Sequence, residues 1–248
     1  MSVLVLGKEM KKQKIDLTVI YYTANCPKRS FAERIRERLL LSIGELPLVS
    51  VSHKPLKFGK NICIGKREKS SLTVYRQILI GAKAAKTKYV ALAEDDTLYP
   101  PTHFELRPSS DDVFAYNLNK WTIFSWLKPS FFMMNRRSTN SSMIAPRKLL
   151  IEAIKERLDR IDNNSKRFRL NNLRWMGEPG RQKYERNLGV TIRKAMAVYT
   201  VSPVVTFYHP KGLSYRALGK RKRRGKVRAM EIPFWGRAEE VIKKYYAR

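Results

Sequence analysis

The residues from Lys86 to Pro100 constrain the fold more than any other stretch of the sequence. A short apolar run, Tyr89 to Ala93, predicts a buried strand, and three consecutive acids, Glu94, Asp95 and Asp96, follow it directly. Adjacent carboxylates repel one another, so their position at a strand end favours a cation that offsets the repulsion. The alternation of side chains along a strand predicts that Glu94 and Asp96 face one way and Asp95 the other.

Two interpretations of these acids remain open at this point. Two hard oxygen donors on one side suit Mg²⁺ or Mn²⁺, with a phosphate completing the coordination shell. Alternatively, the acids lie at the N-terminus of a helix that starts at Pro100 and Pro101, where the helix dipole favours negative charge. An acidic triplet is a short motif, so other parts of the chain have to decide between the two.

The charge balance points to a polyanionic partner. The chain has 248 residues with 51 Lys+Arg against 21 Asp+Glu, a formal net charge of +30. Such an excess opposes compaction through self-repulsion, so nucleic acid is the first candidate partner and an anionic membrane surface the second. A hydrophobic content of 43% excludes disorder over most of the length, and the length suits one α/β domain with an appended tail.

The cellular setting is predicted from absences in the sequence. Cys26 and Cys63 lack metal-ligand spacing and cannot build a disulfide framework, which favours a reduced compartment. No segment is long and apolar enough for a membrane span. We therefore expect a cytoplasmic protein, in a bacterium or, if the chain is virus-encoded, in the infected host cell.

The order of predicted elements favours a parallel sheet. Strands alternate with helices over the first hundred residues, the pattern of right-handed crossovers, and the acids end the second strand-helix-strand unit. The acids therefore lie at the C-terminal ends of the parallel strands, which is the edge where open α/β sheets bind ligands. Ser30 is expected to cap the first helix and Gly44 to end it, and Ser70 or Ser71 to cap the second. Strands are expected at 17–25, 48–52, 89–93, 113–118, 131–135 and 198–208, an apolar run at 142–146, a loop at 54–69, and helices at 31–43, 71–85, 147–161 and 238–246.

In this order the motifs resemble those of the GT-A fold glycosyltransferases, in particular the family-2-like ones, over most of the chain. The first strand ends in Val19-Ile-Tyr-Tyr-Thr-Ala-Asn25, and the segment from Ala82 to Pro101 is similar to the helix, strand and Asp-x-Asp type motif of that family. Glu94 stands in place of the more usual first Asp, and the large acceptor domain of membrane-associated synthases is missing. Three later segments also look like family elements: Asn140-Ser-Ser-Met-Ile-Ala-Pro-Arg147 under the donor sugar, His209-Pro-Lys-Gly-Leu-Ser-Tyr-Arg216 at the metal and diphosphate, and Pro233-Phe-Trp-Gly236 as a closing aromatic motif of prokaryotic and phage relatives.

The resemblance implies a fold and a domain division. The implied fold is α/β, a GT-A (Rossmann-like) mostly parallel central sheet flanked by helices, with a basic C-terminal extension. Residues 1–216 would form the catalytic domain, with a nucleotide-sugar half at about 15–101 and an acceptor half at about 102–216. Residues 217–248 would form a basic C-terminal segment with a closing helix.

The resemblance also implies roles for residues at the donor site. Asp96 would bind Mn²⁺ or Mg²⁺ directly, Glu94 would contact the ribose or the metal, and His209 would be a third ligand. The alternative for His209 is a hydrogen-bonded structural histidine, and for Arg76 it is a solvated helix face. The donor would be a UDP-sugar, and the other implied contacts to it are Thr23, Asn25, Arg76, Asp95, Lys211, Ser214 and Arg216.

Transfer with inversion needs a base that deprotonates the acceptor hydroxyl. Glu178 is the candidate, because a carboxylate in a rigid Gly/Pro turn beside Trp175 favours a raised pKa. A surface turn acid is the alternative, and Asp111 and Asp112 are the fallback bases.

Two groups of basic residues predict contact with a polyanionic acceptor. The tail from Ala217 to Arg228 holds seven basic residues and no acid, which fits phosphate-backbone contact; a solvated tail or a localisation signal is the alternative. A second group is interleaved with Phe168 and Trp175 and would form the other wall of a groove. The tail residues are Lys220, Arg221, Lys222, Arg223, Arg224, Lys226 and Arg228, and the second group is Lys166, Arg167, Arg169, Arg174 and Arg181.

Together these observations predict a metal-dependent hexosyltransferase. It would move a sugar, with glucose from UDP-glucose as the first candidate, onto a hydroxymethylated pyrimidine such as 5-hydroxymethylcytosine in DNA, and is similar in this to phage-type DNA-modifying glycosyltransferases. Two alternatives stay open. One is a peripheral glycosyltransferase for cell-surface lipid or polysaccharide, with its basic face on anionic lipid. The other is a non-enzymatic nucleic-acid-binding protein.

Overall fold

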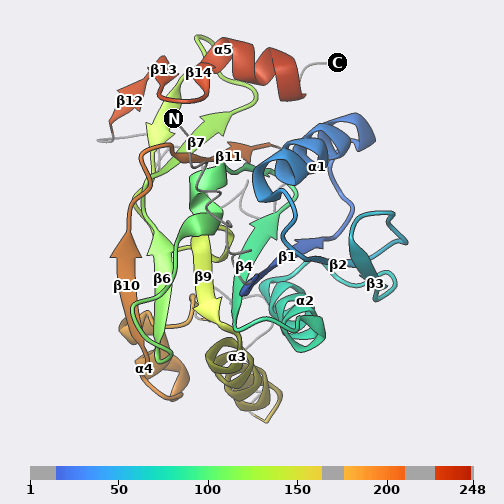
Figure 1. Cartoon of the computed structure of the whole chain (residues 1–248), viewed down its shortest axis with the longest axis vertical. Coiled ribbons are helices and arrows are strands. Elements are labelled where there is room, and N and C mark those ends of the chain that lie inside the picture. Colours follow the sequence, from blue (N-terminus) through green and yellow to red (C-terminus); the bar gives the residue numbers. More distant parts are fainter. Residues whose placement is uncertain (1–14, 164–175, 210–226, 247–248) are drawn as a thin grey trace, which may run out of the picture.

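A seven-stranded sheet forms the centre of the protein (Figure 1). The computed structural model describes residues 15–163, 176–209 and 227–246. The strand order is β10-β6-β9-β4-β1-β2-β3, and only β9 runs antiparallel to its neighbours among the described strands of this sheet. This confirms the predicted α/β class with a mostly parallel sheet. The strands are β1 (Leu17–Thr23), β2 (Leu48–Ser52), β3 (Lys60–Cys63), β4 (Tyr89–Glu94), β6 (Val113–Asn117), β9 (Met143–Pro146) and β10 (Lys194–Val198).

Helices cover both faces of this sheet because alternate residues of the central strands face opposite ways. On β1, Ile20 and Tyr22 pack with α2 (Ser71–Ala84) and α3 (Arg147–Asp162). Val19 and Tyr21 pack on the other face, where Leu39 of α1 (Arg29–Ile43) lies. Every residue of β1 is buried, as expected for a strand in the middle of a parallel sheet.

A second sheet with the order β12-β8-β7-β11-β5 adjoins the carboxyl edge of the first. Its strand β5 begins one residue after Asp96 and pairs with β11, and the Phe207 amide donates to the Asp96 carbonyl at 2.8 Å. The turn that holds the acids is therefore fixed between the two sheets. The strands are β5 (Thr97–Leu98), β7 (Lys120–Phe124), β8 (Phe132–Met134), β11 (Val204–Tyr208) and β12 (Arg228–Ala229).

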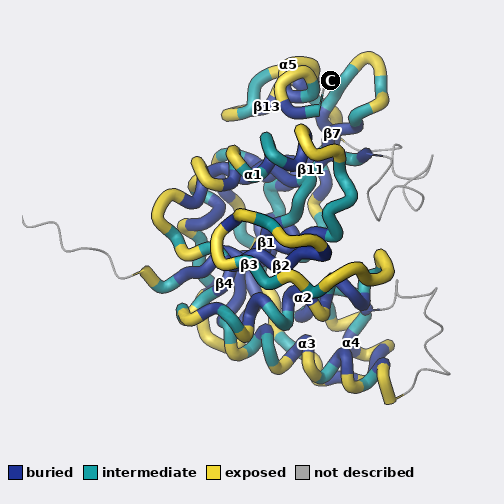
Figure 2. The backbone as a smooth tube through the Cα atoms, turned by 90° about the vertical axis from the view of Figure 1, so that its right-hand side faces the viewer, coloured by how far each residue is buried: buried dark blue, intermediate teal, exposed yellow. Residues whose placement is uncertain are grey.

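The described part of the C-terminal segment packs onto α1 and the second sheet, at the top of Figure 1 and Figure 2. Ile232, Val241 and Tyr245 share an apolar cluster with Phe31 and Ile35 of α1. Of the predicted basic segment at 217–248, residues 227–246 are described, whereas its Lys- and Arg-rich run lies mostly within 217–226, outside the described residues. The elements here are β13 (Glu231–Ile232), β14 (Gly236–Arg237), α5 (Ala238–Val241) and a π-helical turn (Ile242–Tyr246).

Several predicted elements need correction. β3 lies within the expected loop at 54–69, because a short, half-exposed edge strand has no apolar pattern. β7 was not predicted, and the expected strand at 198–208 divides into the end of β10 and β11 around Pro203. α1 starts before Ser30, which therefore does not cap it, whereas Ser70 caps α2 by accepting from the Thr73 amide as predicted. The short helices η1 (Pro101–Glu105), η2 (Asn140–Ser142) and α4 (Gln182–Leu188) carried no clear periodicity.

None of the helices in the described ranges is both long enough and apolar enough to cross a membrane.

Candidate active site

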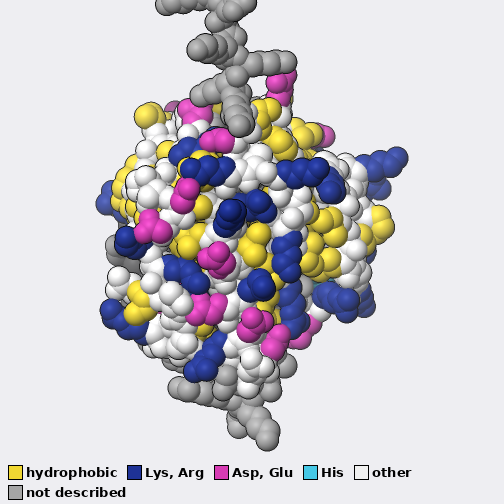
Figure 3. Space-filling model, turned by 60° about the horizontal axis from the view of Figure 1, so that its bottom comes forward, with side chains coloured by type: hydrophobic (Ala, Val, Ile, Leu, Met, Phe, Trp, Pro, Cys, Tyr) yellow, Lys and Arg dark blue, Asp and Glu magenta, His cyan; other side chains and the backbone are white. Residues whose placement is uncertain are grey.

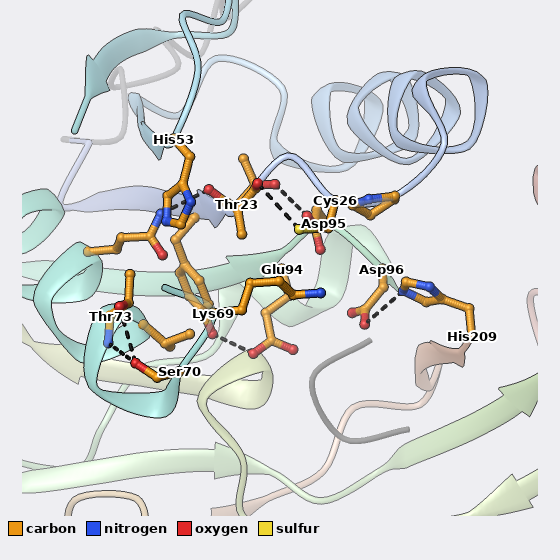
Figure 4. A pocket seen from close by; sticks show the side chains of 15 residues that line it. Thr23, Cys26, His53, Lys69, Ser70, Thr73, Glu94, Asp95, Asp96 and His209 are labelled. Atoms are coloured by element: carbon orange, nitrogen blue, oxygen red, sulfur yellow. Dashed lines mark hydrogen bonds and ion pairs between the residues drawn. The ribbon is translucent and has the colours of Figure 1, made fainter. Parts of the chain in front are cut away.

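A cavity opens at the carboxyl ends of β1 and β4, beside the start of α2 (Figure 4). The three acids and His209, which directly follows β11, all line it, so distant parts of the chain meet there. This is the edge of the sheet at which the sequence predicts a ligand site. The lining residues are Tyr22, Thr23, Ala24, Cys26, Pro27, His53, Lys69, Ser70, Thr73, Val74, Gln77, Glu94, Asp95, Asp96 and His209.

All three acids line this one cavity. The Asp95 side chain is directed toward Thr23, whereas those of Glu94 and Asp96 are directed the other way, as strand alternation predicts (Figure 4). The Tyr22 hydroxyl donates to Glu94 Oε1 at 2.6 Å, and the Thr23 hydroxyl donates to Asp95. Two neighbouring residues of β1 therefore hold two of the three carboxylates in place.

The helix interpretation of the acids is not supported by this geometry. Strand β5 separates the acidic turn from η1, which begins only at Pro101. Stabilisation by a helix dipole is confined to the first turn of the helix. The acids therefore do not cap this helix, and their concentration needs another explanation.

The acids carry an electrostatic cost where they lie. Burial raises the pKa of Asp95 to about 7, and repulsion from Asp96 adds to this shift. Burial and Asp96 likewise raise the pKa of Glu94, while the charge of Lys120 opposes the shift. A cation in the cavity would lower this cost, since opposite charge favours the ionised form.

His209 and Asp96 form the candidate metal-binding pair. His209 Nε2 lies 3.7 Å from Asp96 Oδ2, and this nitrogen is buried with no hydrogen-bond partner in the described structure. An orphaned imidazole nitrogen beside a carboxylate suits a divalent cation whose other ligands come from phosphate and water. No group of three or more His, Cys, Asp and Glu side chains within the described ranges is arranged around a metal position, so the fit rests on this pair.

Of the predicted nucleotide contacts, the structure brings only some to the cavity. Thr23 lines it together with the acids. The Asn25 side chain instead accepts from the amides of His53 and Lys54 and so joins the loops after β1 and β2. Arg76 points away and pairs with Asp162 of α3 at 3.3 Å, which corrects its assignment to the site and matches its alternative as a surface residue. Lys211, Ser214 and Arg216 lie outside the described residues.

The candidate bases occupy different places. Glu178 does not line the cavity, and its carboxylate accepts from Arg181 at 3.0 Å. The charge of Glu178 nevertheless favours the protonated form of Lys120 and so raises its pKa, as do the charges of Glu94 and Asp96, although burial lowers that pKa overall. Asp111 and Asp112 are corrected as fallback bases, because they precede β6 and pair with Lys88 and Lys194 at the opposite edge.

The loop that carries Glu178 is held by three buried side chains. The Tyr75 hydroxyl donates to the Gly177 carbonyl at 2.7 Å, and the Tyr116 hydroxyl donates to the Pro179 carbonyl at 2.5 Å. Glu185 Oε1 accepts from the Gly180 amide at 2.8 Å. Glu178 is therefore presented by a rigidly anchored turn, as its Gly/Pro sequence predicts.

The predicted nucleic-acid contacts are described only in part. Arg228 lies over the Phe131 ring at 4.8 Å, and Arg181 lies over Tyr184 at 4.6 Å while pairing with Glu178. On the face that carries α3 and α4, basic and acidic side chains are interspersed (Figure 3). The other predicted contacts lie outside the described residues: Lys220, Arg221, Lys222, Arg223, Arg224, Lys226, Lys166, Arg167, Arg169 and Arg174.

Two residues of the site were not predicted from the sequence. Lys120 is 3% exposed, and its ammonium donates to the hydroxyls of Thr139, at 2.7 Å, and Ser141. His53 also lines the cavity, its buried Nε2 has no hydrogen-bond partner in the part of the chain that the structure describes, and burial lowers its pKa. The position of His53 directly after β2, at the carboxyl edge, is a signal that could have identified it.

Comparisons with known proteins give only distant likenesses. No family model and no curated protein sequence matches the chain. A glycosyltransferase involved in glycosylation of the major capsid of PBCV-1 is 14% identical, with 77% of this chain and 92% of that one covered and a TM-score of 0.43. The galactosyltransferase LgtC, in complex with donor and acceptor sugar analogs, is 10% identical, with coverages of 83% and 93% and a TM-score of 0.42.

A third likeness is to residues 1–349 of S. aureus TarS in complex with UDP-GlcNAc. It is 8% identical with a TM-score of 0.44, and the match covers 79% of this chain but only 60% of the TarS fragment. The chain also spans only 45% of the length of GlyE from Streptococcus pneumoniae. At such low scores and identities, these likenesses do not assign an activity to this chain.

Proposed function

We propose that this protein is a metal-dependent, GT-A-like glycosyltransferase that moves a sugar from a nucleotide sugar to an acceptor hydroxyl. The observation that carries the proposal is the cavity in which Asp96 and His209 Nε2, a nitrogen with no hydrogen-bond partner among the described residues, lie beside two further half-buried acids. A protein that only binds nucleic acid has no use for such a cluster of negative charge at the edge of its sheet. A nucleotide diphosphate bound through a divalent cation does use it.

The residues of the cavity divide the work of binding the donor. Asp96 and His209 would hold Mn²⁺ or Mg²⁺, which supplies neutralisation of the charge that develops on the leaving diphosphate. Glu94, fixed by Tyr22, and Asp95, fixed by Thr23, would contact the ribose and the metal-bound water. The proposal keeps Lys211, Ser214 and Arg216 as diphosphate contacts, because they follow His209 closely in the sequence.

We place the acceptor on the side of Glu178. In an inverting reaction Glu178 would take the proton from the acceptor hydroxyl as the bond to the donor sugar forms. Among the described contacts Arg181 engages Oε2 of Glu178, so Oε1 keeps the lone pairs that a base needs. Residues 1–216 remain the proposed catalytic domain and residues 217–248 the proposed basic segment.

For the acceptor and donor we propose a hydroxymethylated pyrimidine in DNA and UDP-glucose. The net charge of +30 supports a polyanionic acceptor. The two basic stretches at 166–181 and 220–228 are consistent with contact to phosphates. The proposed setting is the cytoplasm, where UDP-sugars and DNA are both accessible.

The test is sugar transfer by the purified protein. We would incubate it with Mn²⁺, a panel of UDP-sugars and DNA containing 5-hydroxymethylcytosine or 5-hydroxymethyluracil, and read nucleosides by mass spectrometry. We expect a hexose-shifted nucleoside, with a loss of at least about 10²-fold in Asp96→Ala because a charge-stabilising group is removed. Asp111→Ala is the matched control, since it removes an acid from the opposite edge, and it should keep the activity.

Two other outcomes would redirect the proposal. Hydrolysis of the donor without modified DNA would keep the transferase and favour a lipid or polysaccharide acceptor. DNA binding without turnover of any donor, unchanged in Asp96→Ala, would contradict the enzyme and favour the nucleic-acid-binding protein.

A further inference from the structure

The side chain of His209 lies against aromatic rings from the two ends of the described chain. His209 is 4% exposed. The centroid of its ring is 5.7 Å from that of Phe31, at the start of α1, and 6.4 Å from that of Tyr246, in the C-terminal π-helical turn. Residues that are remote in the sequence therefore meet at the candidate metal ligand.

The same rings also pack on one another. Phe31 meets both Tyr246 and Phe207 edge-on, each with a centroid distance of 5.2 Å. Tyr246 lies nearly parallel to Phe207, with centroids 6.3 Å apart and planes inclined by 18°. Because side chains alternate along β11, Phe207 and His209 emerge on the same face, which is why both meet these rings. We call Phe31, Phe207 and Tyr246 the ring cluster.

The turn that carries Tyr246 is held in place by contacts that do not involve His209. Arg34 Nη1, on α1, donates to the Tyr245 carbonyl at 3.3 Å. The Tyr245 side chain is buried in one apolar cluster with Ile35 of α1. π-Helical turns are rare and occur frequently at functional sites. Tyr246 is thus presented to the histidine by a turn that is anchored on α1.

No hydrogen bond from the described residues directs His209 Nε2 toward Asp96. This nitrogen lies 3.7 Å from Asp96 Oδ2, too far for a hydrogen bond, and has no partner among the described residues (Figure 4). A metal-ligating histidine needs a fixed ring orientation, which a second hydrogen bond or close packing supplies. The described ring contacts that supply it here are those of Phe31 and Tyr246.

The ring cluster also stabilises the fold, since Phe31 and Phe207 are buried. Tyr246 differs from them, because it is only half-buried at the margin of the apolar cluster and its ring reaches His209. The neighbouring Tyr245 is buried and meets Phe207 at 6.3 Å. These two tyrosines therefore allow a role in folding to be separated from a role at the site.

We infer that Tyr246 is a positioning residue of the donor site. Together with Phe31 it holds the His209 imidazole so that Nε2 stays directed at the cation position beside Asp96. The inference rests on the proposed function, because it needs a cation at that position. It also gives a task to the closing turn of the C-terminal segment, which lies outside residues 1–216 and would complete their donor site.

The test is a calorimetric titration of Mn²⁺ with UDP present, using the full chain. We expect Tyr246→Ala to bind Mn²⁺ about tenfold more weakly, the effect of losing a group that orients a metal ligand. Tyr246→Phe keeps the ring and should recover most of the affinity. Tyr245→Ala is the matched control, because the Tyr245 ring is 6% exposed and meets Phe207 rather than His209. It should lower the melting temperature at least as much as Tyr246→Ala and leave the Mn²⁺ affinity unchanged.

A spectroscopic readout reports on His209 itself. With ¹⁵N-labelled histidine and saturating Mn²⁺, electron spin-echo modulation from a coordinated imidazole nitrogen should be present in the unchanged protein and reduced in Tyr246→Ala. The chain has three histidines, and His209→Phe identifies the signal. Equal Mn²⁺ affinity in Tyr246→Ala and the unchanged protein would overturn the inference. An equal loss in Tyr246→Ala and Tyr245→Ala would overturn it too, because the effect would then be a general loosening of the turn.

A metal-free measurement distinguishes this inference from the proposed function. The motion of the ¹³C-labelled His209 ring, followed by NMR relaxation, should increase in Tyr246→Ala and not in Tyr245→Ala. If the unchanged protein binds no Mn²⁺ but the ring motion still responds to Tyr246→Ala alone, the metal site fails and the positioning by Tyr246 stands. If Mn²⁺ binds and neither its affinity nor the ring motion responds to Tyr246→Ala, the positioning fails and the metal site stands.

Discussion

Two groups of charged side chains, one fully buried and one half-buried, differ in how completely their charges are matched. Arg157 of α3 and Glu185 of α4 are fully buried and form an ion pair at 2.8 Å. Both Glu185 oxygens are occupied, since Oε1 also accepts from the Gly180 amide and Oε2 accepts from the Arg193 amide. One cation meets one anion there, so the charges balance, and among the described contacts only Arg157 Nε of this pair lacks a hydrogen-bond partner.

The acids at the end of β4 show the opposite arrangement. Three carboxylates share the cavity, whereas the described cations that act on Glu94 and Asp96 are Lys120 and the titratable His209. Buried charges are stable only when they are paired. The difference teaches that the Arg157–Glu185 ion pair stabilises the fold by itself, whereas the acids at the end of β4 are incomplete without a ligand.

The largest effect on stability is expected when the buried Arg157–Glu185 ion pair is broken. Glu185→Leu leaves the Arg157 guanidinium buried without its partner, so we expect the free energy of unfolding to fall by about 3–5 kcal/mol. Urea denaturation followed by circular dichroism measures this. The double variant Arg157→Met with Glu185→Leu should regain part of the loss, because no unpaired charge remains, although the Gly180 and Arg193 amides still lack their acceptor.

An exposed ion pair provides the contrast for that experiment. Arg29 and Glu33 pair at 2.8 Å on the surface of α1, with 92% of the Arg29 side chain exposed. Glu33→Gln should hardly change the denaturation midpoint, since water screens such a pair. If Glu185→Leu changed the denaturation midpoint as little as Glu33→Gln, the distinction between a buried and an exposed ion pair would be wrong.

A smaller effect is expected at Lys120, whose charge acts on Glu94. Lys120→Met removes the charge that opposes the pKa rise of Glu94 and leaves two hydroxyls without their donor. We expect a loss of about 1–3 kcal/mol in stability and about tenfold weaker binding of UDP with Mn²⁺.

The matched control for Lys120 is Lys148→Met, which removes an exposed lysine at the start of α3. Calorimetry of UDP binding should not distinguish it from the unchanged protein. Unaltered donor binding in Lys120→Met would mean that this ammonium only fills space in the second sheet.

The effect that is smallest at neutral pH, and grows as the pH falls, comes from His103, near the junction of the two sheets. His103 is fully buried, its Nδ1 accepts from the Asn117 amide at 3.2 Å, and burial together with the Lys120 charge lowers its pKa to about 3. The folded protein keeps this histidine neutral, whereas the unfolded chain takes up a proton below about pH 6.5. The unfolded state is therefore favoured as the pH falls.

The measurement compares the unchanged protein with His103→Phe from pH 7 to pH 4. We expect the stability of the unchanged protein to fall by about 1.4 kcal/mol more per pH unit below pH 6 than that of the variant. Parallel curves for the two proteins would show that His103 is hydrated or paired in the folded state.

The sequence predicted the parts of the fold that are encoded locally. α1, α2 and α3 have apolar residues at helical spacing, and β1, β2 and β4 are continuous apolar runs, so their positions followed within a few residues. β3 and β7 did not follow. β3 is a half-exposed edge strand, and β7 begins with Lys120, a charged residue that only tertiary packing buries.

The site was predictable to the same extent. Three acids after a strand are visible in the sequence, and the resemblance to a family singled out His209. The roles of Asn25 and Arg76 were not predictable, because whether a polar side chain faces a cavity, a neighbouring loop or another helix depends on packing between distant segments. Lys120 and His53 were missed for the same reason.

The most direct test of the central claim is a calorimetric titration of Mn²⁺ into the protein with UDP present. The account predicts one cation bound per chain, and little or no binding in Asp96→Asn or His209→Phe under the same conditions. EDTA should reverse the stabilisation that the cation gives to the unchanged protein. Equal Mn²⁺ binding in all three proteins, or none in the unchanged protein, would contradict the claim that this acidic cavity is a cation-dependent nucleotide site.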